Sequence, residues 1–247
     1  EPQQRPVPSL PGVDYSSRSP RFDFGSPAEA QKGLTYLAEH GYVVVAGVMN
    51  QEEIAEAKDK FWAWVHEVSH ARRGEVATWG DYVWPGDADS GIFHRKGIGQ
   101  SDFMWYVRSR PAVRHAFALV WDDDNLLVSF DGCGAFRPWS VDPRWRTLGG
   151  WYHVDQDPVS KPGRHCVQGL VQLTDAGAHT GGLTVIPGSH AQFEDMGARL
   201  AAVLGGGDYV TVPRNDRALR VAGRLVQCAA GDLLLWDSRT IHCNSPA

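Results

Sequence analysis

The spacing of apolar residues in the first half of the chain predicts a long helix after Asn50. Apolar residues there recur at steps of three or four positions, which places them on one face of an α-helix. They are Ile54, Ala57, Phe61, Val65 and Val68. Asn50 and Glu53 form a capping box, so the helix is expected to begin directly after Asn50. A shorter helix is predicted over residues 111–119.

An earlier helix with the same kind of start is also predicted. Ser26, Pro27 and Glu29 supply an N-cap, a proline at the first helical position and the acidic residue of a second capping box. Gly41 is expected to end this helix, because glycine readily adopts the left-handed conformation found there. The apolar run 42–45 then predicts a short buried strand.

From about residue 125 the pattern changes to short β-rich runs separated by Gly, Pro and Asp clusters. The predicted strands are Leu126–Phe130, Gly150–Val154, Cys166–Leu173, Leu183–Ile186, Arg224–Cys228 and Leu233–Trp236. Such runs indicate a β-sandwich or barrel. The chain is therefore predicted to be mostly β with flanking helices. An extended arm over 1–25 precedes a single domain over 26–247, with a helical layer over about 26–120 and a β core over about 125–247.

Composition and charge narrow the class of protein. The 247 residues carry a net charge of −5, which argues against a protein that binds nucleic acid mainly through its charge. No apolar run approaches the ~20 residues that span a bilayer, so no membrane span is expected. The four cysteines show no CxxC spacing and no disulfide-dense pattern, which predicts an intracellular, cytoplasmic protein. Because the chain begins without Met, organelle targeting stays open.

Two residues of one predicted strand form a candidate metal-binding pair. His153 and Asp155 stand two positions apart, and such residues point to the same face of a strand. An imidazole nitrogen and a carboxylate oxygen together suit Fe(II). A second histidine would complete a two-histidine, one-carboxylate face with open coordination positions. His242 is the candidate, since it follows the apolar strand 233–236 and a polar turn.

A third motif, the run GGLTVIPGSH that ends at His190, makes the pattern specific. With all three motifs in this order, the chain resembles the phytanoyl-CoA dioxygenase family of Fe(II)/2-oxoglutarate-dependent oxygenases. The resemblance covers about residues 30–247 and implies a double-stranded β-helix core, the cupin-like jelly-roll. It further implies that His153, Asp155 and His242 are the iron ligands, and that His190 is a structural residue of its turn.

The resemblance implies a dioxygenase that hydroxylates a C–H bond of a small organic substrate, either lipid-like or a secondary metabolite. The implied cofactors are Fe(II), O₂ and the co-substrate 2-oxoglutarate, which is decarboxylated to succinate, with ascorbate as reductant in vitro. A carboxylate at Asp155 favours hydroxylation over halogenation, because a halide needs that coordination position. Two alternatives stay open: a catalytically silent jelly-roll binding protein, and a zinc-dependent hydrolase that uses the same His/Asp/His site. The oligomeric state is not predicted.

The residues that bind 2-oxoglutarate are less clearly marked. In the family, an arginine beyond the distal histidine pairs with the far carboxylate, so this arginine and the last jelly-roll strand are expected beyond Ala247. A guanidinium or ammonium group within the chain is the other option. The candidates within the chain are Arg164, Lys96, Gln168, Gln172 and Asn244. Gln168 and Gln172 share one strand face, which suits either a polar interior or an exposed edge.

Aromatic residues near the HxD pair predict the substrate pocket. Trp151, Tyr152 and Trp139 are expected to line it, although core packing explains each of them equally well. Asp157 is an alternative carboxylate for the metal. Its place directly before Pro158 suits a loop-shaping role better.

Overall fold

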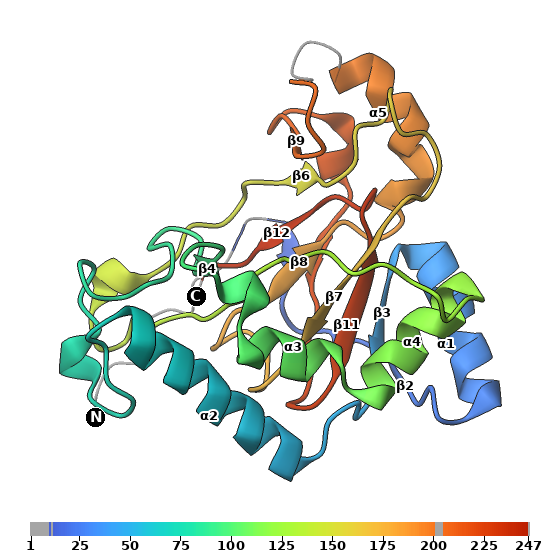
Figure 1. Ribbon diagram of the computed structural model, residues 1–247. Coiled ribbons are helices and arrows are strands. Elements are labelled where there is room, and N and C mark those ends of the chain that lie inside the picture. The colour runs from blue at the N-terminus through green and yellow to red at the C-terminus, as the bar shows by residue number, and fades with distance from the viewer. Residues whose placement is uncertain (1–9, 11, 201–204, 247) are drawn as a thin grey trace.

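Two β-sheets lie face to face at the centre of the molecule (Figure 1). The computed structural model describes residues 10, 12–200 and 205–246, so residues 1–9 and 11 of the predicted arm lie outside the described residues, as does Ala247. The larger sheet has the order β1 (Val13–Asp14), β10 (Gly223–Leu225), β8 (Leu183–Val185), β12 (His242–Asn244), β6 (His153–Val154), β9 (Val210–Thr211). The smaller sheet has the order β2 (Arg21–Phe22), β3 (Tyr42–Val45), β11 (Leu233–Asp237), β7 (Val167–Val171).

This pair of sheets is the predicted jelly-roll. The sheets stay separate and do not close into a barrel. A two-stranded sheet of β4 (Ile92–Phe93) and β5 (Cys133–Gly134) accompanies them. The helices are α1 (Pro27–His40), α2 (Gln51–Val68), α3 (Asp102–Arg108), α4 (Pro111–Trp121) and α5 (Phe193–Leu200). Short 3₁₀ turns are η1 (Val76–Thr78), η2 (Ile98–Gln100), η3 (Pro143–Trp145), η4 (Ser189–Gln192) and η5 (Arg217–Arg220).

Strand β11 is apolar at nearly every position because both of its faces are covered. Leu233 and Leu235 pack into a core that includes residues of α2 and α4. Leu234 and Trp236 point the other way and pack against residues of the larger sheet. The alternation of a strand therefore assigns one face to the helices and the other to the interior of the jelly-roll. Figure 1 shows the helical layer on the outer side of the smaller sheet.

The predicted helix starts are confirmed at one cap and corrected at the other. Asn50 accepts a hydrogen bond from the Glu53 backbone at 2.9 Å, and the Glu53 side chain accepts from the Asn50 backbone at 3.0 Å. At Ser26 the helix begins as predicted, but the serine side chain makes no capping bond. The acid of that predicted box is occupied elsewhere, because Glu29 pairs with Lys32 at 2.7 Å.

The predicted strands are confirmed with different ends, with one exception. Leu126–Phe130 forms no strand, and this prediction was wrong. A strand needs a neighbour for its backbone N–H and C=O groups, and no described strand pairs with this segment. Leu127 is fully exposed, so the segment does not pack this apolar side chain against the hydrophobic core. The arm also differs from expectation, because β1 and β2 pair with β10 and β3.

Two helices were not predicted, although each carries a local signal. Ser101 caps α3 by accepting from the Met104 backbone at 3.2 Å. In α5, the residues Phe193, Met196, Gly197 and Leu200 are buried at helical spacing. Their short length weakened both signals. In the described part of the chain, no helix combines the length and apolar character needed to cross a membrane.

Candidate metal centre

Three side chains from the two predicted motifs converge where strands β6 and β12 of the larger sheet pair. The Nε2 atom of His242 lies 3.2 Å from Asp155 Oδ2, and the Nε2 atom of His153 lies 3.5 Å from Asp155 Oδ1. One potential ligand atom from each residue lies within 4.8 Å of the others. Both histidines are buried, whereas the Asp155 side chain is 24% exposed. The arrangement is therefore anchored in the sheet and open on the carboxylate side.

Strand pairing explains why the two histidines meet. His153 on β6 and His242 on β12 are direct partners across an antiparallel pair, so their side chains lie on the same face. Their ring centroids are 4.2 Å apart. Asp155 follows β6, and its backbone N–H donates to the Ser238 carbonyl at 2.9 Å. The turn that precedes His242 thus also holds the backbone of Asp155.

The protonation of the two imidazoles suits metal binding. His153 Nδ1 lies 3.2 Å from the Trp151 carbonyl oxygen, and His242 Nδ1 lies 2.9 Å from the Thr240 carbonyl oxygen. A carbonyl oxygen only accepts hydrogen bonds, so each Nδ1 must carry the proton. The neutral tautomer then leaves the Nε2 lone pair free to face a cation.

The electrostatic environment favours the same charge states. Burial lowers the pKa of His242, which favours the neutral imidazole that a metal requires. Burial raises the pKa of Asp155, but the neighbouring His153 and His242 imidazoles outweigh burial and lower it below its usual range. An anionic carboxylate with two neutral imidazoles is a donor set that fits Fe(II). These residues therefore fit the metal that the sequence predicts.

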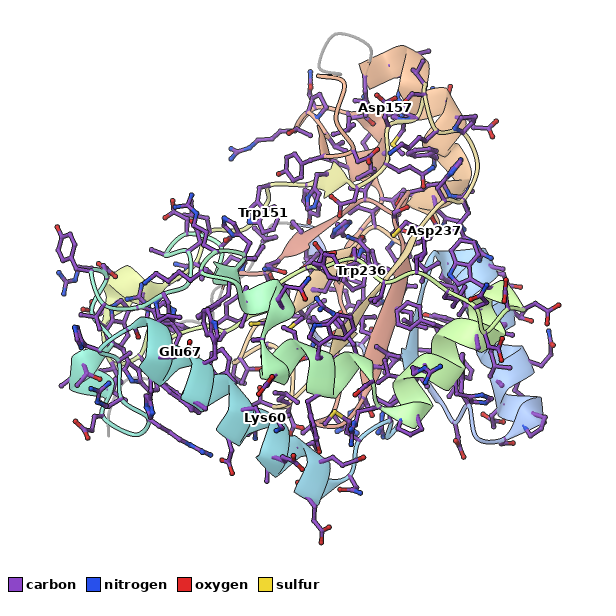
Figure 2. All side chains as sticks on the ribbon, in the orientation of Figure 1. Lys60, Glu67, Trp151, Asp157, Trp236 and Asp237 are labelled. Atoms are coloured by element: carbon purple, nitrogen blue, oxygen red, sulfur yellow. The ribbon has the colours of Figure 1, made fainter. Side chains whose placement is uncertain are left out.

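Aromatic rings flank both histidines. The Trp151 ring stacks on His153 with centroids 5.1 Å apart, and the Tyr209 ring stacks on it at 4.5 Å. The Trp236 ring lies 5.5 Å from that of His242. Figure 2 labels Trp151 and Trp236 near the centre of the molecule. Tyr209 and Trp236 were not singled out in the sequence as site residues.

The two glutamines predicted from one strand face lie at different distances from the triad. Gln168 donates from Nε2 to Asp155 Oδ2 at 2.9 Å. Gln172 lies four residues further along, where its backbone N–H donates to the Asp232 carbonyl. Leu170 lies between them and packs against the interior core. The shared face thus points into the jelly-roll, and Gln168 is the member that reaches the triad.

The remaining co-substrate candidates are engaged by other parts of the chain. Arg164 donates to the Val120 carbonyl and lies over the Trp121 ring, 4.6 Å from its centroid. Lys96 donates to the Val68 carbonyl at the end of α2. Asn244 on β12 donates to the Ser90 carbonyl at 3.3 Å. Their predicted contact with 2-oxoglutarate stays a prediction, as does an arginine beyond Ala247.

Two of the three aromatic side chains predicted to line the substrate pocket make no ring contact with the metal triad. Tyr152 precedes His153 on the strand, so it points to the opposite face and packs against the core around Val154. Trp139 is half-buried in the segment before η3. Trp151 alone of the three contacts a predicted ligand directly, through its stacking on His153.

Asp157 and His190 have structural contacts, in line with their sequence contexts. Asp157 accepts from the backbone N–H groups of Val159 and Ser160, which closes the loop after the HxD pair. In Figure 2 it lies beside α5, away from Trp151. His190 makes its hydrogen bond through Nε2 to the Ala38 carbonyl at the end of α1.

Comparison with protein families gives the site a context. Residues 139–246 match the family described as phytanoyl-CoA dioxygenase (PhyH). This part of the chain is therefore similar to phytanoyl-CoA dioxygenases. All three residues of the triad lie within it. The match confirms the predicted enzyme class, an oxidoreductase of the dioxygenase type.

Individual relatives agree with this assignment. The Aspergillus versicolor protein named Ava biosynthesis cluster protein O is 28% identical over 217 residues, which is 82% of this chain and 68% of that protein. The epimerase SnoN, solved with Fe³⁺, α-ketoglutarate and nogalamycin RO, is 16% identical with a TM-score of 0.55, over 90% of this chain and 78% of SnoN. EctD from S. alaskensis is 16% identical with a TM-score of 0.57, over 98% of this chain and 79% of EctD. At these identities, the two structures support the jelly-roll fold.

Proposed function

We propose that the protein is an Fe(II)- and 2-oxoglutarate-dependent dioxygenase that hydroxylates a C–H bond of a small organic molecule. The observation that carries the proposal is the convergence of His153, Asp155 and His242 with both Nε2 lone pairs free. Two neutral imidazoles and one carboxylate occupy only part of the coordination sphere of a metal. The open positions are needed to bind 2-oxoglutarate and O₂. Bound Fe(II) would supply the oxidation that couples loss of CO₂ from 2-oxoglutarate to formation of a C–OH bond.

The protein's own groups then have defined tasks. The carbonyl oxygens of Trp151 and Thr240 hold the two imidazoles in the tautomer that binds a cation. Trp236 Nε1 is a buried donor with no hydrogen-bond partner among the described residues, and its ring lies beside His242. It is suited to donate to a carboxylate or carbonyl oxygen of the co-substrate. Trp151 and Tyr209 present aromatic surface beside His153, where a substrate with an apolar or planar part would pack.

A small-molecule substrate is favoured by the known relatives. The Aspergillus relative carries the name of a biosynthesis cluster, and the two structural neighbours have nogalamycin RO or 5-hydroxyectoine in their titles. Fold and motif do not choose among such molecules. The proposed class is therefore a small organic metabolite, with lipid-like and secondary-metabolite substrates both included.

Succinate formation from 2-oxoglutarate tests the proposal. The purified protein would be supplied with Fe(II), ascorbate and O₂, and a panel of metabolites would be screened by mass spectrometry for products that gain one oxygen atom. We expect succinate only when both Fe(II) and O₂ are present. Activity that needs Zn(II) but not O₂ would favour the hydrolase instead. Metal binding without succinate formation for any substrate would favour a silent binding protein.

The neighbouring carboxylates provide a matched pair of variants. Asp155→Asn and Asp157→Asn make the same chemical change two residues apart. Asp155→Asn removes the anionic metal ligand and is expected to abolish succinate formation. Asp157→Asn keeps an oxygen that can accept from Val159 and Ser160, so activity should persist. If only Asp157→Asn lost activity, the metal ligand would be Asp157, and the assignment of Asp155 would be wrong.

A further inference from the structure

Gln168 links the smaller sheet to the candidate metal ligand of the larger sheet. It lies on β7, whereas Asp155 directly follows β6, and the two side chains meet across the interior of the jelly-roll. The Gln168 Nε2 atom donates to Asp155 Oδ2 at 2.9 Å. This carboxylate oxygen is also the one that lies 3.2 Å from His242 Nε2. The amide therefore acts on the carboxylate at the point where the triad converges.

The orientation of the Gln168 amide is set by Asp155. Its other atom, Oε1, is buried and has no hydrogen-bond partner among the described residues. Buried polar atoms are rarely left this way, because an unpaired acceptor loses its hydrogen bonds to water without replacement. Rotating the amide by half a turn would place Oε1 against the negative carboxylate, which is repulsive. The hydrogen bond to Asp155 thus persists although it leaves the opposite end of the amide unpaired.

The strand register holds Gln168 in place. Gln168 and Trp236 are direct partners across the β7–β11 pair. Trp236 lies beside the His242 ring at 5.5 Å, while Gln168 reaches Asp155. One cross-strand pair of the smaller sheet therefore contacts two members of the triad. Because both residues are part of a regular strand, their positions do not depend on a loop.

We propose that Gln168 is a positioning residue that fixes the orientation of the Asp155 carboxylate toward the metal. The inference rests on the proposed function, since it concerns the same metal site. A carboxylate on a single residue can rotate and can bind a metal with one oxygen or two. A hydrogen bond to one oxygen restricts that choice and keeps coordination positions free for small ligands. Partners of this kind typically change metal affinity about 10- to 100-fold when they are removed.

Equilibrium titration of the metal-free protein with Co(II) tests the role of Gln168 without turnover. Gln168→Leu removes the hydrogen-bond donor to Asp155 and replaces the amide with an apolar side chain of similar size. We expect its Kd for Co(II) to rise about 10-fold or more. The visible absorption bands of bound Co(II) should change as well, because they report coordination geometry. Gln168→Asn keeps the amide but withdraws it by one methylene, and it should show the same change if Gln168→Leu does not fold.

Gln227→Leu is the matched control. The Gln227 amide also makes one 2.9 Å hydrogen bond, to the Tyr15 carbonyl, but does not contact the triad. Its Kd and Co(II) spectrum should match those of the wild type. If both Gln168 variants kept the wild-type Kd and spectrum, the inference would be overturned, although the metal site itself would stand. The inference would also be overturned if Gln227→Leu weakened Co(II) binding as much as the Gln168 variants. Failure of the wild-type protein to bind Co(II) would overturn the proposed function itself.

Discussion

The backbone N–H of Asp155 donates a hydrogen bond to the carbonyl oxygen of Ser238 at 2.9 Å. The hydroxyl of Ser238 in turn donates to Gln156 Oε1 at 2.9 Å, and both of these side chains are buried. The turn before His242 is therefore tied twice to the segment that contains His153 and Asp155. This connection fixes the distance between two motifs that are far apart in the sequence.

Ser238→Ala should reduce stability without preventing folding. The variant loses the hydroxyl bond to Gln156, although Gln156 Oε1 still accepts from the His165 backbone at 3.1 Å. We expect a loss of about 1 kcal/mol in the free energy of unfolding, measured by urea denaturation. Ser16→Ala removes an exposed hydroxyl bond to Asp14 and should change stability by less than about 0.5 kcal/mol. Equal effects in the two variants would contradict the importance of the Ser238 contact.

The two helix caps should differ in their contribution to stability. Asn50→Ala removes a side-chain acceptor from the first turn of α2 and should cost about 1 kcal/mol. Ser26→Ala should cost clearly less, because Ser26 makes no side-chain capping bond in α1. Urea unfolding of both variants checks this difference. A larger loss in Ser26→Ala would mean that the predicted Ser26 capping box forms after all.

Gly41→Ala should be strongly destabilising because two separate effects combine. Gly41 has φ of 78°, and an added Cβ would lie 2.4 Å from Thr240 Oγ1 and 2.6 Å from His190 Nδ1. We expect a loss of more than about 2 kcal/mol from strain and overlap together. Gly47→Ala shares the positive φ, at 63°, but its Cβ would meet no atom within 4 Å. It should lose only about 1–2 kcal/mol from strain. Similar thermal shifts for both variants would contradict the close packing at Gly41.

Thiol labelling should separate Cys166 from the other cysteines. Burial raises the pKa of Cys133, Cys228 and Cys243 to about 12, so their thiols stay protonated and unreactive at pH 8. Cys166 is exposed, although burial and nearby carboxylates raise its pKa above the ordinary 9.0. Because the thiolate is the reactive form, its labelling rate should keep increasing with pH beyond 9.0.

Labelling stoichiometry under native and denaturing conditions provides the check. The native protein should react at Cys166, and Cys166→Ser should abolish this reaction. All four cysteines should react after denaturation. Rapid native labelling of Cys166→Ser would show that the core around the remaining cysteines opens readily.

The sequence was most informative where local chemistry alone determines the structure. The Asn50–Glu53 box needs only neighbouring residues, and the run 42–45 needs only a buried place in a sheet. His153 and Asp155 were expected on one face of a strand, and both reach the triad, although Asp155 lies directly after the end of β6. The match of His242 to this pair depended on resemblance, because no local rule joins residues 89 positions apart.

Other features depend on tertiary partners that sequence spacing does not reveal. Leu126–Phe130 has strand-like composition, yet no described strand pairs with it. Glu29 has the position of a capping residue, yet it pairs with Lys32. The contact between Gln168 and Asp155 joins two sheets, so the sequence left open whether Gln168 faces a polar interior or an exposed edge, and it did not indicate the partner.

Turnover under isotopically heavy O₂ tests the central claim most directly. An Fe(II)/2-oxoglutarate-dependent dioxygenase divides the two atoms of O₂ between succinate and the hydroxylated product. We expect each succinate formed by the wild-type protein to contain one heavy oxygen atom, and we expect no labelled succinate from Asp155→Asn. Product that forms without O₂, or succinate that lacks the heavy atom, would contradict the assignment of His153, Asp155 and His242 as the iron site of a dioxygenase.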